Sequence, residues 1–382
     1  MNGYIYMDHN ATTTLRPEAV EAMTAALALT GNPSSVHGPG RAARKTLETA
    51  RGRVADLVGA APSDVIFTSG GTEANNLAIT GTRRHRLLVS AVEHPSVLNS
   101  DGEVIPVDGD GIVDLERLDM MLNADDTPAL VSVMLANNET GVIQPIARVA
   151  EIVHRHGALL HCDAVQGAGK LVLNMAGLGA DMLSVSSHKI GGPSGVGALI
   201  IARLESRRDL NLQATGFGGG QERGFRVGTE NLTGIAGFGA AAHMVATLID
   251  EMPRIAGLRD KLETAIRAIE PEAIIFCEDV ERLANTSCLT MPGTDNSTQV
   301  MSFDLAGVGV SAGSACASGK VKASEVLKAM QVDTEIAATA IRVSLGWSND
   351  ESDVEALVTA WKDLHDRRDD SSKAGLLAKP AA

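Results

Sequence analysis

Short apolar runs rich in β-branched residues alternate with helical patterns through the first two thirds of this 382-residue chain, and this alternation strongly constrains its fold. Strands that alternate with helices pair into a mostly parallel sheet whose faces the helices cover. The pattern therefore predicts an α/β fold. The predicted strands are Val65–Thr68, Arg86–Ser90, Leu130–Leu135, Ala158–His161, Met182–Val185 and Val196–Ile201. The predicted helices are Gly40–Val58, Thr72–Ile79, Leu115–Leu122 and Pro145–His156.

The last third restarts with a different pattern, which predicts a smaller α+β domain. Two long helical stretches lead into it, at about Glu230–Ile249 and Arg254–Ile269. Its predicted strands are Ala273–Cys277, Ser287–Met291 and Ile341–Leu345, and its predicted helices are Ser297–Leu305 and Glu351–His365. From Arg367 the sequence turns polar, which is typical of a frayed tail.

Composition narrows the class of protein. Hydrophobic residues make up 44% of the chain, enough for one or two cores, and the formal net charge is −14. Phosphate contacts need clustered Lys and Arg, so broad nucleic-acid binding is not expected. The longest apolar runs are strand-sized, so no membrane span is predicted. The N-terminus shows no basic region followed by an apolar stretch, and the cytoplasm is the expected location.

Lys189 and Asp163 each follow a predicted strand, at the edge where open α/β sheets bind ligands. Lys189 lies between Ser187 and Gly191, a setting that suits a desolvated Schiff-base lysine and equally suits a snorkelling surface lysine. Asp163 could hold a protonated ring nitrogen, or simply cap a helix.

A strand, a glycine turn and a helix start follow one another at Thr68–Asn76. Backbone N–H groups and hydroxyls converge at such a turn and can bind a phosphate, although a Ser/Thr-capped helix has the same residues. The segment matches neither nucleotide-binding glycine motif. Two further segments, Gly31–Gly40 and Gly216–Gly228, are rich in small residues that suit either close ligand approach or ordinary turns.

The four cysteines form no CxxC pair. Three of them lie in apolar sequence segments and are expected to be buried: Cys162, Cys277 and Cys288. Cys316 lies instead in Ser311–Gly319, where no long apolar side chain anchors the segment. It is either a small residue in a tight turn or a mobile, reactive thiol.

Taken together, these segments resemble the cysteine desulfurases of the NifS/IscS type, within the class V aminotransferase group of fold-type I pyridoxal-phosphate enzymes. The resemblance runs from Tyr6 to about Trp347. It is carried by ordered motifs at Tyr6–Thr13, Gly31–His37, Phe67–Glu73, Glu93–His94, Asn137–Gly141, His161–Gln166, Ser186–Lys189, Gly218–Gly224, Arg226–Asn231, Ser314–Cys316 and Ile341–Ser344.

The resemblance implies a role for each matching residue. Lys189 would bind pyridoxal 5'-phosphate as a Schiff base and move the substrate Cα proton, and His94 would stack on the ring and serve in proton transfer. Cys316 would take the sulfur of L-cysteine as a persulfide. The ring nitrogen would be held by Asp163 and the ring oxygen by Gln166; the phosphate would be held by Thr72, Ser186, His188 and, from the neighbouring subunit, Thr229. Asn138 and Arg342 would bind the substrate carboxylate, which a planar guanidinium suits. No metal site is predicted.

The same resemblance implies the architecture and the partners. It implies a seven-stranded, mostly parallel sheet in a large cofactor domain at 15–260. Residues 1–14 and 261–366 would form a small domain that carries the cysteine loop at about 311–322, and 367–382 a flexible tail. The implied partners are L-cysteine, a second copy of the chain, and a sulfur-acceptor protein such as an iron–sulfur scaffold. A selenocysteine lyase, an aminotransferase and a catalytically silent scaffold are the alternatives; an aminotransferase has no need of Cys316, and a silent scaffold has no need of the full residue set.

Overall fold

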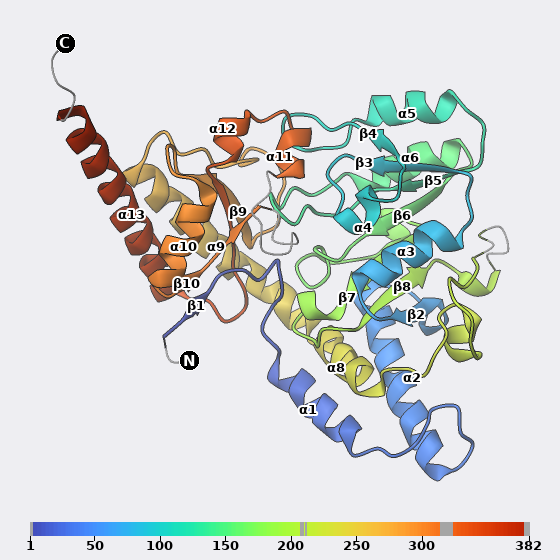
Figure 1. Ribbon diagram of the computed structural model, residues 1–382. Coiled ribbons are helices and arrows are strands. Elements are labelled where there is room, and N and C mark those ends of the chain that lie inside the picture. The colour runs from blue at the N-terminus through green and yellow to red at the C-terminus, as the bar shows by residue number, and fades with distance from the viewer. Residues whose placement is uncertain (1–2, 207–209, 211, 314–323, 378–382) are drawn as a thin grey trace. The chain divides into compact units, whose positions relative to one another are not determined.

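The computed structural model describes residues 3–206, 210, 212–313 and 324–377 (Figure 1). The chain forms two compact units. Unit 1 comprises Met1–Ala11, Glu139–Val142 and Glu251–Ala382, and unit 2 comprises Thr12–Asn138 and Ile143–Asp250. The predicted domain bounds, 15–260 against 1–14 with 261–366, stay a prediction.

Unit 2 is built on a seven-stranded sheet in the order β2-β8-β7-β6-β5-β3-β4. The strands from β7 to β4 run parallel to one another, while β8 is antiparallel to both β7 and β2. The predicted seven-stranded, mostly parallel sheet is therefore confirmed. The strands are β2 (Val65–Thr68), β3 (Arg86–Ser90), β4 (Glu103–Ile105), β5 (Ala129–Ser132), β6 (Leu159–Asp163), β7 (Met182–Ser186) and β8 (Gly197–Ile201).

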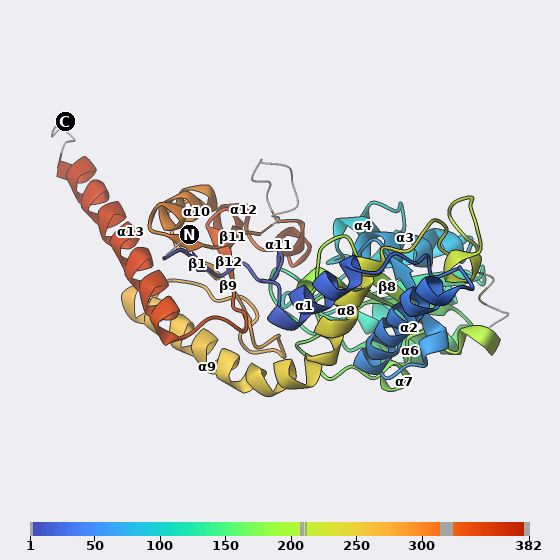
Figure 2. The ribbon, with the colours of Figure 1, turned by 90° about the horizontal axis from the view of Figure 1, so that it is seen from below.

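Helices cover both faces of this sheet, as the alternation of side chains along β2 shows. Ile66 packs in a core cluster with Ala74 and Leu77 of α3 (Gly71–Gly81). Its neighbour Phe67 points to the other face, where it meets Phe238 of α8 (Leu232–His243) edge to face. Figure 2 shows α8 beside α1 and α2, which it contacts. The other helices of this unit are α1 (Pro17–Leu27), α2 (Gly38–Val58), α4 (Pro95–Leu98), α5 (Leu115–Asn123), α6 (Ile146–Arg155) and α7 (Met175–Leu178).

Unit 1 holds an antiparallel sheet in the order β11-β12-β9 and a parallel pair, β1 with β10. Its core contains Trp361, Phe303 and Ile341, all almost fully buried. The strands are β1 (Ile5–Tyr6), β9 (Thr286–Thr290), β10 (Val308–Gly309), β11 (Ser311–Ala312) and β12 (Ala340–Ser344). The helices are α10 (Asn296–Leu305), α11 (Glu325–Ala329), α12 (Thr334–Ala337) and α13 (Glu351–Leu377). Helix α9 (Val245–Ile269) begins in unit 2 and continues into unit 1.

Three local predictions differ from the structure. The predicted strand 273–277 forms only an isolated bridge at Ile275, because Cys277 turns the backbone to a φ of +59°. The break between the two long helices lies near Met244, whereas Pro253 is inside α9. Where a tail was expected from Arg367, α13 continues as far as Leu377.

Two other expectations concern burial and membranes. The predicted burial of three cysteines is confirmed for Cys162, Cys277 and Cys288. Among the described residues, no single helix has both the length and the hydrophobicity to cross a membrane. The helices Leu232–His243 and Thr247–Ile269 have sufficient length and hydrophobicity only when they are taken together, and they meet at a bend of 66°.

Candidate active site

Three strand ends of unit 2 meet at Gly71, the first residue of α3. Before it, Gly70 has a φ of +155°, a conformation that side chains disfavour. A Cβ on Gly71 would lie 2.8 Å from Cγ2 of Val165 and 3.5 Å from Cβ of Ser186. The turn after β2 thus lies against the ends of β6 and β7. This contact brings the predicted phosphate turn to the predicted ring-binding residues.

Asp163 ends β6, and its side chain is buried and held from two sides. Its Oδ1 accepts a hydrogen bond of 3.0 Å from the Val165 N–H. Its Oδ2 accepts one of 2.7 Å from Nδ2 of Asn75, on α3. A carboxylate has about four lone-pair sites, so these two bonds leave capacity for a further donor such as a protonated ring nitrogen.

His94 lies at the start of α4 and is tied to the same network. Its Nδ1 lies 2.7 Å from Oγ of Ser96 and accepts a bond of 3.1 Å from the Ser96 N–H. Nδ2 of Asn75 donates to the same Ser96 Oγ over 2.9 Å. Asn75 and Ser96 therefore join Asp163 to His94, two residues that the resemblance assigns to one cofactor ring.

Lys189 follows β7 in the 3-10 turn η2 (Ser187–Lys189). The turn is closed by the Gly192 N–H, which donates to the Ser187 carbonyl over 3.0 Å. A Cβ on Gly192 would lie 2.1 Å from the Ser187 hydroxyl oxygen, so any side chain there would force Ser187 to move. The turn fixes where the Lys189 side chain leaves the sheet.

His188 is anchored to the segment that opens unit 2. Its Nδ1 lies 3.1 Å from Oγ1 of Thr12, and its carbonyl accepts from the Thr13 N–H. Burial, with the neighbouring Lys189 charge, lowers the pKa of His188 to about 4. His188 is therefore neutral at pH 7 and can offer a hydrogen bond to a phosphate, without adding a charge.

Two further polar groups surround this network. Oε1 of Gln166 accepts from Nζ of Lys170 over 2.7 Å, so its amide nitrogen is the end that can donate to a ring oxygen. Glu93 is buried, and Oε1 accepts from the Met134 N–H over 2.5 Å. Burial, together with the nearby Asp163 charge, raises the pKa of Glu93 well above its usual range. Glu93 is thus favoured as a neutral acid.

These residues fit pyridoxal phosphate. The group needs a buried carboxylate for its ring nitrogen, a flat partner for its ring face and hydrogen-bond donors for its phosphate. Asp163, His94 and the turn at Gly71 supply these features within unit 2. Thr72 is solvent-exposed and Asn138 half-buried in the same unit. Thr229 is also exposed, and no described contact links it to this network.

Arg342, in unit 1, is the predicted carboxylate ligand. It lies on β12 and is 2% exposed. Its Nη2 donates to Oδ1 of Asp8 over 2.5 Å. In the same unit, Glu139 is buried and Oε2 accepts from the Ser324 hydroxyl over 2.6 Å. Cys316 lies outside the described residues.

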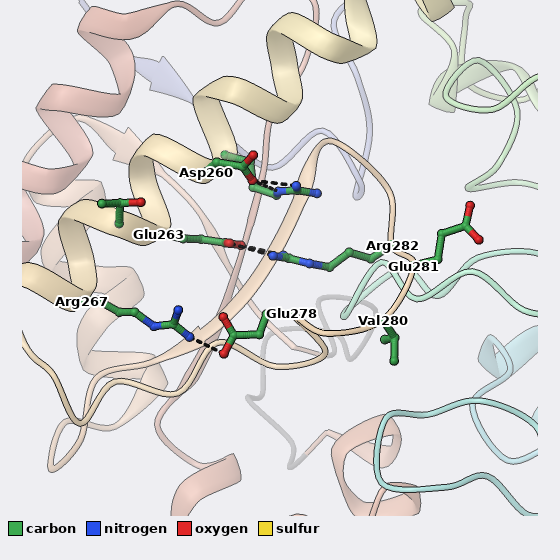
Figure 3. A pocket seen from close by; sticks show the side chains of 9 residues that line it. Asp260, Glu263, Arg267, Glu278, Val280, Glu281 and Arg282 are labelled. Carbon is green, nitrogen blue, oxygen red and sulfur yellow. Dashed lines mark hydrogen bonds and ion pairs between the residues drawn. The ribbon is translucent and has the colours of Figure 1, made fainter.

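A pocket of about 660 Å³ lies elsewhere in unit 1 (Figure 3). Most of its charged side chains are paired with one another. Arg282 pairs with Glu263 over 2.6 Å, and Arg267 pairs with Glu278, as the dashed lines show. None of the predicted site residues is among its lining residues, so it is not the candidate active site.

Sequence reasoning missed Asn75, Ser96 and Asp8 as functional residues. Asn75 had a detectable signal. It lies three and four residues before the apolar Ala78 and Ile79, at helical spacing, where a polar side chain implies a buried partner. Ser96 and Asp8 had no comparable signal.

Comparison with known proteins covers nearly the whole chain. The family model described as aminotransferase class-V matches residues 5–357. A Cereibacter sphaeroides protein named cysteine desulfurase is 43% identical over 371 residues, 93% of this chain and 94% of that protein. An IscS-like cysteine desulfurase of Mycobacterium tuberculosis is 40% identical, covering 92% and 93%. The solved structure of a NifS-like protein from Rickettsia africae has a TM-score of 0.87 at 38% identity, covering 95% of this chain and 99% of that one. The family match includes every predicted site residue.

Proposed function

Since the chain belongs to the aminotransferase class-V family and is a pyridoxal-phosphate-dependent cysteine desulfurase, we propose that it holds the sulfur of L-cysteine as a persulfide on Cys316. The buried pairing of Asp163 with Asn75, linked through Ser96 to His94, carries the assignment of the cofactor site. This network lies against the glycine turn where a phosphate can bind. The names of the relatives support the choice of cysteine as substrate.

In this proposal each residue of the network has one task. When bound, the cofactor supplies an electron sink for the substrate Cα. Lys189 would hold it covalently and then move the Cα proton. Asp163 would keep the ring nitrogen protonated, and His94 would lie on the ring face. Gln166 would donate to the ring oxygen. The remaining phosphate and carboxylate contacts would come from Thr72, Ser186, His188, Asn138, Thr229 and Arg342.

The sulfur transfer requires one thiol of the protein, that of Cys316. The Cys316 thiolate attacks the substrate sulfur, an S–S bond forms and the C–S bond breaks. The electron pair of the C–S bond stays with the carbon, which gains a proton to give L-alanine. Cys316 keeps a persulfide, and an acceptor thiol or an added reductant removes its outer sulfur. We expect an acceptor protein such as an iron–sulfur scaffold.

A homodimer is part of the proposal. Thr229 directly follows the glycine-rich segment 216–228, and Phe217 in that segment is fully exposed. Aromatic residues are enriched at protein interfaces, so Phe217 supports a contact of this segment with a second copy. Sedimentation of the active enzyme tests this, and a fully active monomer would contradict it.

Incubation with L-cysteine and a reductant tests the function. Sulfide and alanine should form in equal amounts, whereas pyruvate or no sulfide would contradict the assignment. Cys316→Ser should still bind cofactor and L-cysteine but release no sulfide, because a hydroxyl is a far weaker nucleophile than a thiolate at neutral pH. The matched control is Cys288→Ser. In alkylated wild-type enzyme the extra sulfur should be on the Cys316 peptide, and on none of the other three cysteines.

A further inference from the structure

We propose that Asn75 and Ser96 are positioning residues that couple Asp163 to His94 and hold His94 in the tautomer with its proton on Nε2. The proposal rests on the function proposed above. It assigns His94 a narrower role than the resemblance does. His94 acts as a hydrogen-bond donor on the ring face, and Lys189 alone takes the substrate proton.

The orientation of the Asn75 amide follows from its partners. Asn75 is 1% exposed, and its Nδ2 lies 2.7 Å from Oδ2 of Asp163. A carboxylate oxygen only accepts, so the amide nitrogen must face it. The reversed amide would place its carbonyl oxygen against the carboxylate. The second N–H of the amide is directed to Ser96 Oγ, 2.9 Å away.

Ser96 then determines the tautomer of His94. Its backbone N–H can only donate, and it points at Nδ1 over 3.1 Å. Nδ1 must therefore carry a lone pair. Since Ser96 Oγ already accepts from Asn75, its own hydrogen is available for Nδ1, 2.7 Å away. A neutral imidazole has one N–H, which is consequently on Nε2.

This tautomer decides what His94 can do. With the proton on Nε2, that nitrogen can donate a hydrogen bond but cannot accept a proton. Nδ1, the accepting nitrogen, is occupied by Ser96. The amide group of Asn75 helps to orient both Asp163 and His94. A change at Asn75 should therefore affect both contacts to the cofactor ring at once.

The test compares the holoenzyme carrying Asn75→Leu or Ser96→Ala with a matched control, Asn76→Leu. Asn76 is the next residue on α3, is exposed, and its side chain donates to the Thr72 carbonyl. The first readout is the ¹⁵N spectrum of histidine-labelled protein. The chain has 10 histidines, and His94→Asn identifies the resonances of His94.

In the wild type, Nδ1 of His94 should be pyridine-type and Nε2 pyrrole-type. Both Ser96→Ala and Asn75→Leu keep the Ser96 backbone N–H, so His94 should stay in this tautomer. The Nδ1 resonance should shift in each, because Nδ1 loses the Ser96 hydroxyl or the hydroxyl loses its fixed orientation, and Asn76→Leu should cause no such shift. In steady-state assays both variants should lose about tenfold in kcat, or ~1.4 kcal/mol, with little change in KM. A purely structural role would lower stability without shifting the Nδ1 resonance of His94.

Two results would overturn the inference. One is a pyridine-type Nε2 in wild-type His94. The other is a kcat for Asn75→Leu and Ser96→Ala equal to that of Asn76→Leu. Ser96 is only partly buried, so its alanine variant serves if Asn75→Leu does not fold. Wild-type enzyme that releases no sulfide would refute the proposed function instead, and the tautomer could still be read from the spectrum.

Discussion

Replacing Arg51 should lower the stability of unit 2, because this residue neutralises a buried carboxylate. Nη1 and Nη2 of Arg51 each donate to Glu222 over 2.8 Å, and the two side chains are 6% and 1% exposed. Glu222 also accepts from the Phe67 N–H over 2.9 Å, and the guanidinium lies 4.9 Å from the Phe67 ring centre. The pair fastens the segment 216–228 to β2 and α2, although Glu222 has a left-handed backbone with a φ of +43°.

Arg51→Met keeps most of the apolar contact but leaves the Glu222 carboxylate with one backbone donor. Breaking a buried ion pair from one side costs about 3–5 kcal/mol. The double variant Arg51→Met/Glu222→Gln removes the buried charge, so it should recover at least ~1 kcal/mol of that loss. Arg267→Met is the control, since the Arg267 and Glu278 side chains are 44% and 35% exposed. Such an exposed pair contributes at most ~1 kcal/mol.

Urea denaturation followed by far-ultraviolet circular dichroism measures these differences. Both tryptophans, Trp347 and Trp361, lie in unit 1, so their fluorescence gives a separate signal for that unit. Arg51→Met should shift the dichroism transition and leave the fluorescence transition less affected. A loss for Arg51→Met no larger than that of Arg267→Met would refute the reasoning, as would a double variant less stable than the single one.

Three other outcomes follow from the structure. Asp8→Asn should raise the KM for L-cysteine about tenfold (~1.4 kcal/mol) and change kcat less, because Asp8 orients Arg342; an unchanged KM would contradict this. Burial lowers the pKa of His161 from 6.5 to about 4. Between these two pH values the unfolded chain therefore binds more protons than the folded chain. The free energy of unfolding consequently falls by ~1.4 kcal/mol per pH unit as the pH drops from 6.5 towards 4. His161→Gln should flatten this slope in urea titrations at several pH values, and an unchanged slope would count against it. Lys189→Ala should abolish both turnover and the borohydride-reducible cofactor linkage while the dichroism spectrum is kept; a remaining reducible linkage would show that another lysine binds the cofactor.

Local patterns were sufficient for much of the fold. The predicted bounds of Val65–Thr68 and Arg86–Ser90 match β2 and β3, because each is a short apolar run that ends at a hydroxyl residue. The long helices were harder. Two stretches were predicted, ending near Ile249 and starting near Arg254, yet α9 continues through this region and the chain bends earlier, near Met244.

The candidate site divides in the same way between local and distant information. Asp163 and Lys189 were found because each follows an apolar strand, and parallel strands end at a common edge. Asn75 and Asp163 are 88 residues apart, and Asn75 and Ser96 are 21 apart. Helical spacing indicates that the Asn75 amide is buried, and a buried amide needs partners. Which partner it meets depends on the strand order. Strand β6 lies between β5 and β7 and contacts α3. A residue that binds the ring directly can therefore be recognised by its place at a strand end, whereas a residue that orients it becomes visible only once the sheet is assembled.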